Sequence, residues 1–278
     1  MKRFLLRCLL WILVLFGLEG VMYLTGFRFP SFNGKEVFRS ISLSKEKSGK
    51  GVLILGDSVG QQLYPSQRSY PDAVSLSCNQ AVTMAGQYFL MYRYFEANAD
   101  ALPERVVLVC TPQCLQNDLD QFTYQYFLKP FYTGEYKPLF NDILLARLQH
   151  IPHYRTASLP FIRVSNYAFA YDLEPDVPYS LVSPLSRSYL QKMSGLASSK
   201  GVSFSLLCPP VRESLQEWVD SLCICAAKDD EMEEELIDAY RSSITPYPDS
   251  LFRDRYHYIR DHTPVPVDSC MFSFRKVD

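Results

Sequence analysis

The feature that most constrains the fold is an apolar run, residues 52–55, that ends abruptly in Gly-Asp-Ser. The run holds β-forming residues without polar alternation, which is typical of a parallel strand covered on both faces. Asp57 and Ser58 then place a turn and a hydroxyl at the carboxyl end of this strand. Ligand crevices of open α/β sheets lie at that edge. An ordinary Asp-Ser turn at the end of a strand is the alternative interpretation.

Two further apolar runs, residues 105–110 and 202–208, predict buried strands that end at the same edge. Before the second run, Ser183 and Pro184 form the start signature of a helix, which Lys200-Gly201 ends. Strands that alternate with helices predict an α/β fold with a parallel sheet. The chain has 278 residues, 47% of them hydrophobic, which is enough for one such domain with a full core.

A second motif, Asp254-x-x-His257, lies near the other end of the chain. A serine hydroxyl needs a base within hydrogen-bond reach, and the base needs an orienting partner. His257 is our candidate base and Asp254 its orienting partner, because residues three apart share one face of a turn. Asp261-His262 is a rival pair.

Gly-Asp-Ser after the first strand, followed about 200 residues later by Asp-x-x-His, resembles the SGNH/GDSL hydrolase superfamily. The resemblance covers residues 51–262, with specific matches at its two ends. It implies a flavodoxin-like three-layer α/β/α fold and a catalytic triad of Ser58, His257 and Asp254. The layout is closest to the membrane-anchored subgroup that modifies envelope polysaccharides, which includes lipoteichoic acid D-alanylation and alginate O-acetylation proteins.

The resemblance also implies an oxyanion hole, which in this family combines backbone N–H groups with an asparagine amide. Gly86, which precedes an aromatic-rich helical pattern, is the candidate glycine, although a glycine that merely permits a turn fits equally well. Asn117 is the candidate asparagine. The family motif Gly-x-Asn-Asp stands here as Leu-Gln-Asn-Asp, so Asn117 as a helix cap is the alternative.

The N-terminal residues 1–25 are almost entirely apolar after a basic start, which predicts one transmembrane helix with a cytoplasmic N-terminus. A cleaved signal peptide is the alternative. Residues 26–50 contain Gly, Pro, Ser and a charged run, so we interpret them as a linker. Residues 51–278 then form the α/β domain, on the extracytoplasmic side of the membrane, periplasmic or at the cell surface.

The net charge and the cysteine spacing limit the partners and ligands that we expect. The net charge of −2 and the absence of a basic tract argue against a nucleic-acid partner. The spacing of the eight cysteines completes no zinc site. A serine-based mechanism requires neither a metal nor a cofactor, so we expect none. Cys110 and Cys114 are either a disulfide or two buried small hydrophobic residues.

These features together predict a serine-dependent esterase or O-acyltransferase that acts on acyl groups of a cell-envelope glycan or on another ester. Hydrolysis and transfer differ only in the acceptor, water or a sugar hydroxyl. The partners expected are the acylated glycan, the membrane and a membrane acyltransferase. The alternative is a non-catalytic scaffold of the same fold, or a glycan-binding partner of a membrane acyltransferase or export complex.

Overall fold

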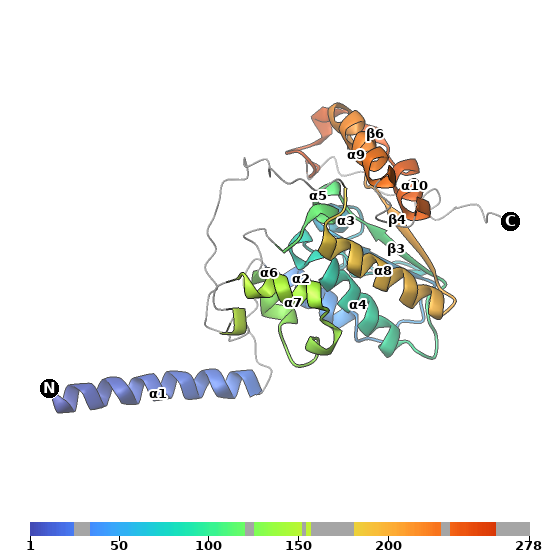
Figure 1. Ribbon diagram of the computed structural model, residues 1–278. Coiled ribbons are helices and arrows are strands. Elements are labelled where there is room, and N and C mark those ends of the chain that lie inside the picture. The colour runs from blue at the N-terminus through green and yellow to red at the C-terminus, as the bar shows by residue number, and fades with distance from the viewer. Residues whose placement is uncertain (25–33, 120–124, 152–153, 157–180, 229–233, 260–278) are drawn as a thin grey trace.

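The computed structural model describes residues 1–24, 34–119, 125–151, 154–156, 181–228 and 234–259 (Figure 1). Its centre is a four-stranded parallel sheet in the order β2-β1-β3-β4. The strands are β1 (Val52–Gly56), β2 (Ala73–Ser75), β3 (Arg105–Val109) and β4 (Ser203–Leu207). The apolar runs at 52–55, 105–110 and 202–208 are therefore strands, as the sequence predicts, and their carboxyl ends meet at one edge.

Helices surround the sheet. In chain order they are α2 (Lys35–Leu43), α3 (Ser58–Leu63), α4 (Thr83–Ala97), α5 (Pro112–Gln116), α6 (Gln125–Phe131), α7 (Asp142–Gln149), α8 (Pro184–Ser199), α9 (Gln216–Lys228) and α10 (Glu234–Ser242). The predicted start of α8 is confirmed, because the Ser183 hydroxyl caps the helix and Pro184 occupies its first turn.

Both faces of the sheet are buried, as a parallel sheet requires. Leu53 and Leu55 point into a large core that also holds buried residues of α4 and α8, whereas Ile54 between them points into a second, smaller core. The smaller core includes α3 and the C-terminal residues Phe252 and Tyr258. The chain is thus an α/β protein with a parallel sheet, an arrangement compatible with three α/β/α layers.

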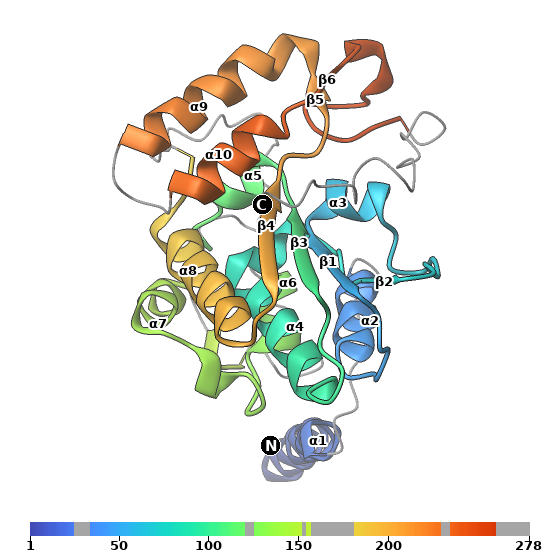
Figure 2. The ribbon, with the colours of Figure 1, turned by 90° about the vertical axis from the view of Figure 1, so that its right-hand side faces the viewer.

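A small unit lies at the carboxyl end of the strands. It consists of α9, α10 and the parallel pair β5 (Val211–Arg212) and β6 (Pro246–Tyr247). Figure 2 shows this unit above the sheet, at the same end as α3. The chain leaves β4 through Cys208 and two prolines into β5, so the sheet edge that holds Ser58 is also the edge that this unit covers.

The N-terminal helix α1 (Lys2–Leu24) has 23 residues, and its described side chains are mostly exposed and apolar. Within the part of the chain that is described, no helix combines the length and the apolar character needed to cross a membrane.

The interpretation of residues 26–50 as a linker differs from the structure, which places α2 there. Val37 and Ser40 on this helix are buried, and Val37 belongs to the larger core. The segment looks like a linker in sequence because glycine, proline and charged residues flank a helix of only nine residues. The domain therefore begins before residue 51.

Candidate active site

The turn between β1 and α3 is held by Asp57, whose carboxylate is completely buried. One carboxylate oxygen caps α3 by accepting hydrogen bonds from the N–H groups of Val59 and Gly60, at 2.9 and 3.0 Å. The other accepts from the N–H and the hydroxyl of Thr111, at 2.7 and 2.6 Å. Asp57 thereby ties the end of β1 to the end of β3, and both of its oxygens are occupied.

The start of α3 approaches the end of β3 very closely. A Cβ atom added to Gly56 or Gly60 would lie 2.5 or 2.6 Å from the carbonyl oxygen of Val109. Because that oxygen belongs to the backbone of a buried strand, no side chain can be accommodated at either position without a backbone shift. The two glycines therefore fix where Ser58, which lies between them, emerges from the sheet.

Ser58 is the first residue of α3. The first N–H groups of a helix have no partner within the helix, and here the carboxylate of Asp57 takes those of Val59 and Gly60. Among the described residues, no acceptor is recorded for the N–H of Ser58. This N–H points out of the positive end of the helix, so it is available to a negatively charged oxygen.

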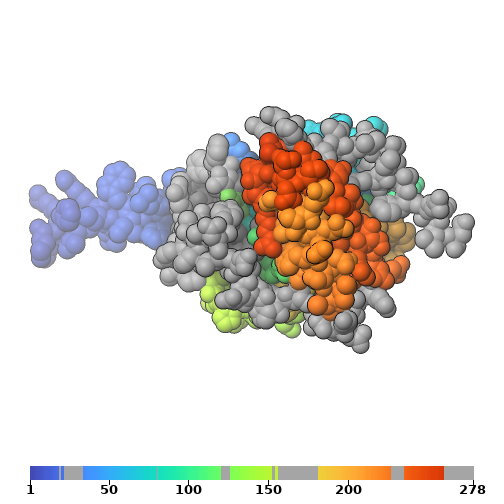
Figure 3. Space-filling model, turned by 90° about the horizontal axis from the view of Figure 1, so that it is seen from above, coloured from blue at the N-terminus to red at the C-terminus, as the bar shows by residue number. Residues whose placement is uncertain are grey.

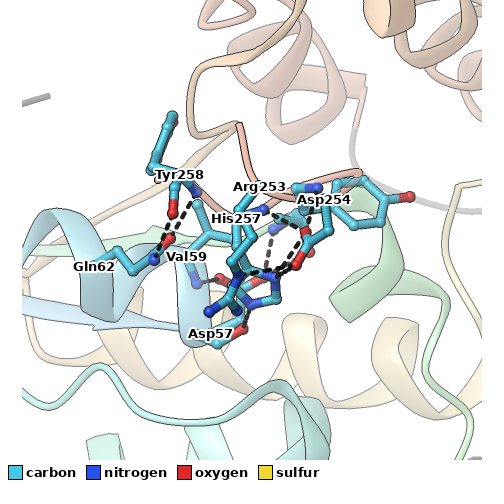
Figure 4. Close-up of polar contacts among 10 residues, drawn as sticks. Asp57, Val59, Gln62, Arg253, Asp254, His257 and Tyr258 are labelled. Carbon is cyan, nitrogen blue, oxygen red and sulfur yellow. Dashed lines mark hydrogen bonds and ion pairs between the residues drawn. The ribbon is translucent and has the colours of Figure 1, made fainter. Parts of the chain in front are cut away.

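The two sequence motifs meet at Ser58. Its Oγ lies 2.8 Å from Nε2 of His257, although the residues are 199 positions apart. The other ring nitrogen, Nδ1, lies 3.0 Å from both carboxylate oxygens of Asp254. Figure 4 shows His257 held between the carboxylate of Asp254 and the turn after β1. With Nδ1 facing a carboxylate, the N–H is assigned to Nδ1, and Nε2 is free to accept the proton of Ser58.

The carboxylate of Asp254 organises its own turn. Its Oδ1 accepts the backbone N–H groups of Tyr256 and His257, at 3.0 and 2.8 Å. Burial alone raises the pKa of Asp254, but these two backbone hydrogen bonds and the nearby His257 ring outweigh it, so the pKa is lower than usual. Asp254 is therefore ionised near neutral pH and positioned to orient His257.

Gln62 joins the C-terminal segment to α3. Its side-chain amide donates to the carbonyl oxygen of Tyr258 at 3.3 Å and accepts from the N–H of Tyr258 at 3.1 Å (Figure 4). Gln62 lies four residues after Ser58, one helical turn along the same face, and Tyr258 directly follows His257. One amide thus connects the helix that begins at the serine to the residue beside the histidine. Neither Gln62 nor the role of Asp57 was among the sequence predictions.

The predicted oxyanion residues, Gly86 and Asn117, make other contacts in the structure. Gly86 is buried in α4, where an added Cβ would lie 2.8 Å from Val82 and 3.0 Å from Phe131, so close helix packing explains this glycine. Asn117 is buried at the end of α5, and its side-chain oxygen accepts the N–H of Leu119 at 3.0 Å. No recorded contact joins either residue to Ser58. Asn117 thus forms a local turn after α5.

Cys110 and Cys114 are buried free thiols. The rival pair Asp261-His262 lies outside the described residues. Within the described chain, no group of three or more His, Cys, Asp or Glu side chains is arranged to hold a metal ion.

Comparisons with known proteins identify no family for this chain. The chain matches no protein-family model, no curated protein and no solved structure at a significant level. The geometry around Ser58 is therefore the main indication of function.

Proposed function

We propose that the protein is a serine-dependent ester hydrolase or O-acyltransferase. The observation that carries the proposal is the continuous chain of contacts from Ser58 Oγ to His257 Nε2 and from His257 Nδ1 to Asp254. This is the order of nucleophile, base and orienting carboxylate that acyl transfer through serine needs. The resemblance of the two motifs to SGNH/GDSL hydrolases supports the same assignment and a flavodoxin-like arrangement of the three layers.

The reaction follows from these positions. His257 Nε2 takes the proton of Ser58 as Oγ attacks the ester carbonyl carbon, and the carbonyl oxygen becomes an oxyanion beside the N–H of Ser58. The protonated His257 then gives its proton to the departing alkoxide, which leaves as an alcohol. Water, or a hydroxyl of a sugar, next attacks the acyl-serine, with His257 again accepting the proton. The products are a free acid or a new ester, and Ser58 is regenerated.

The substrate class comes from the resemblance. We propose that the ester is an O-acyl group on a cell-envelope glycan and that the domain lies outside the cytoplasm, held at the membrane through the apolar side chains of α1. The exposed apolar side chains of α1 support the anchor. A membrane acyltransferase is the partner that such a location favours.

One observation favours the second candidate, a non-catalytic scaffold or glycan-binding protein. No recorded contact joins Gly86 or Asn117, the residues expected to complete an oxyanion hole, to Ser58; the contacts given for them are helix packing and a local turn. Among the described residues, the N–H of Ser58 is then the one donor at the nucleophile that we can name. A scaffold needs no oxyanion donor at all.

Labelling with a fluorophosphonate probe separates the two candidates. We expect the full-length chain in detergent to be labelled covalently, and Ser58→Ala and His257→Ala to abolish the labelling. Ser221→Ala is the matched control, because this exposed serine of α9 has one recorded hydrogen bond among the described residues, to the carbonyl oxygen of Trp218, and should not affect labelling. A folded wild-type protein that is never labelled would refute the enzyme and support the scaffold.

A further inference from the structure

The Asp-x-x-His turn is attached to the rest of the fold on one side of His257. Tyr258, the next residue, makes two hydrogen bonds with the side-chain amide of Gln62, and its hydroxyl donates to the carbonyl oxygen of Pro210 at 2.8 Å. On the other side, the hydrogen bonds recorded for the described residues 253–256 all stay within the turn. The position of this half of the turn therefore depends on packing with its neighbours.

Arg255 connects this half of the turn to α9. The central carbon of its guanidinium lies 4.3 Å from the ring centre of Trp218 on α9 and 5.6 Å from that of Tyr256. Its Nε is buried, and among the described residues this atom has no hydrogen-bond partner. A guanidinium stays charged at physiological pH and is attracted to the face of an aromatic ring, most strongly to that of tryptophan. The contact with Trp218, the shorter of the two, therefore holds the side chain of Arg255 against α9.

The helix α9 is a firm support for this contact. Val219 and Cys223 of the helix are buried in the larger core, and Trp218 itself packs against that core. Figure 3 shows α9, in orange, beside the last described residues of the chain, in red. The segment around the histidine is therefore held by two different parts of the fold: Tyr258 lies in the smaller core, and Arg255 lies against a helix of the larger core.

His257 lies between these two attachments, two residues after Arg255 and one before Tyr258. Its ring is bound to Asp254 within the turn, so a movement of the turn carries base and carboxylate together. With the attachment at Tyr258 alone, the turn can pivot about that residue and lengthen the 2.8 Å contact between His257 Nε2 and Ser58 Oγ. The contact with α9 opposes this pivot.

We propose that Trp218 is a positioning residue of the candidate active site. By stacking on Arg255, it holds the turn with Asp254 and His257 at the distance from Ser58 that proton transfer needs. This inference rests on the proposed function and adds α9 to the elements that assemble the site. Among the described residues, no recorded contact joins Trp218 to Ser58 or His257, so its effect passes through the turn.

Trp218→Ala tests this role through two reactions of the full-length chain in detergent, both measured well below the Tm of the variant. The first is fluorophosphonate labelling, resolved into the affinity for the probe and the maximal rate constant kinact. We expect kinact to fall roughly 3- to 30-fold, as the loss of one cation–π contact allows, while the affinity stays within about twofold of wild type. Trp218→Phe keeps an aromatic face and should recover most of kinact.

The second reaction is carbethoxylation of His257 by diethyl pyrocarbonate, followed by peptide mass spectrometry, and it needs no reactive serine. The reagent attacks an unprotonated ring nitrogen, and Nε2 is shielded by its contact with Ser58. A turn that moves away exposes Nε2, so the modification rate should rise severalfold in Trp218→Ala. Lys192→Met, the matched control, removes an ammonium group 5.3 Å from the ring centre of Tyr189 on α8 and should change neither reaction.

If Trp218→Ala does not fold, Arg255→Met removes the charge from the other side of the contact and should have the same two effects. An unchanged carbethoxylation rate of His257 in the folded variant, or an unchanged kinact where the wild type is labelled, would overturn the positioning role. A fall in kinact that Trp218→Phe does not reverse would do the same. The two proposals fail separately: a wild-type chain that is never labelled refutes the enzyme, whereas carbethoxylation still decides the role of Trp218.

Discussion

Replacing Gln62 with alanine tests whether the contact between α3 and the C-terminal segment positions the histidine. The side chain makes two hydrogen bonds to the backbone of Tyr258, at 3.3 and 3.1 Å, and Tyr258 is fully buried. Each neutral hydrogen bond contributes about 0.5–1.5 kcal/mol, so the free energy of unfolding should fall by about 1–3 kcal/mol. For a domain of this size that corresponds to a fall in Tm of about 2–12 °C.

The effect on reactivity should be larger than the loss of stability suggests. Without Gln62, His257 is free to move away from Ser58, and a displacement of about 1 Å costs up to roughly a hundredfold in rate. We therefore expect the rate constant of fluorophosphonate labelling to fall roughly 10- to 100-fold, measured well below the Tm of the variant. Labelling time courses and thermal unfolding of the same preparations provide both numbers.

Gln61→Ala is the control, since this neighbour is also partly buried on α3 and makes no recorded side-chain hydrogen bond within the described chain. A Gln62→Ala protein that loses stability but is labelled at the wild-type rate would show that the contact does not position His257. No change in either quantity would show that the two hydrogen bonds contribute nothing in solution.

Three other predictions concern the scaffold of the site. Asp57→Asn places an amide NH2 group where a carboxylate oxygen accepts a hydrogen bond from a buried N–H. The free energy of unfolding, measured with denaturant, should therefore fall by about 2–4 kcal/mol. Gly60→Ala should cost about 1–3 kcal/mol, because the new Cβ lies 2.6 Å from a backbone oxygen, whereas Gly195→Ala in open space on α8 should stabilise by about 0.5–1 kcal/mol. Hydrogen bonds from Ser214 and Arg212 lower the pKa of Asp249 to about 2, so its stabilising effect is present above about pH 4 and is lost as the pH falls through about 2. Arg212→Gln should raise this pKa in an NMR titration.

The strands of the sheet could be predicted because their signal is local. Each buried parallel strand is a short run of β-branched and aliphatic residues bounded by turn residues, and a run such as 105–110 contains all of that information. The helix α2 could not be predicted in the same way. It buries Val37 in a core that distant elements supply, α4 and α6 among them, and nothing in its own nine residues specifies those neighbours.

In the candidate site too, the residues with a local signal could be predicted and those that depend on distant contacts could not. Ser58, Asp254 and His257 were identified because each lies in a motif of a few residues whose geometry is fixed locally. Gly86 and Asn117 were assigned by family spacing along the chain, and spacing does not say which side of a helix or turn faces the nucleophile. Asp57 did carry a usable signal, since an Asp directly before a helix start is a common cap, but its hydrogen bonds to Thr111 depend on the pairing of β1 with β3.

The two aspartates near Ser58 explain why the Asp-x-x-His turn can bring a base to a serine 199 residues away. Asp57 is closer in sequence, but its oxygens already hold four hydrogen bonds, so it cannot orient a histidine. Asp254 fixes the His257 ring within its own turn, so that the orientation of the base does not depend on the rest of the fold. The fold then has to place only one small rigid unit. The burial of Phe252 and Tyr258 in the smaller core and the amide of Gln62 supply that placement. Loosening these contacts should therefore change the distance between the base and the serine while the contact between Asp254 and His257 persists.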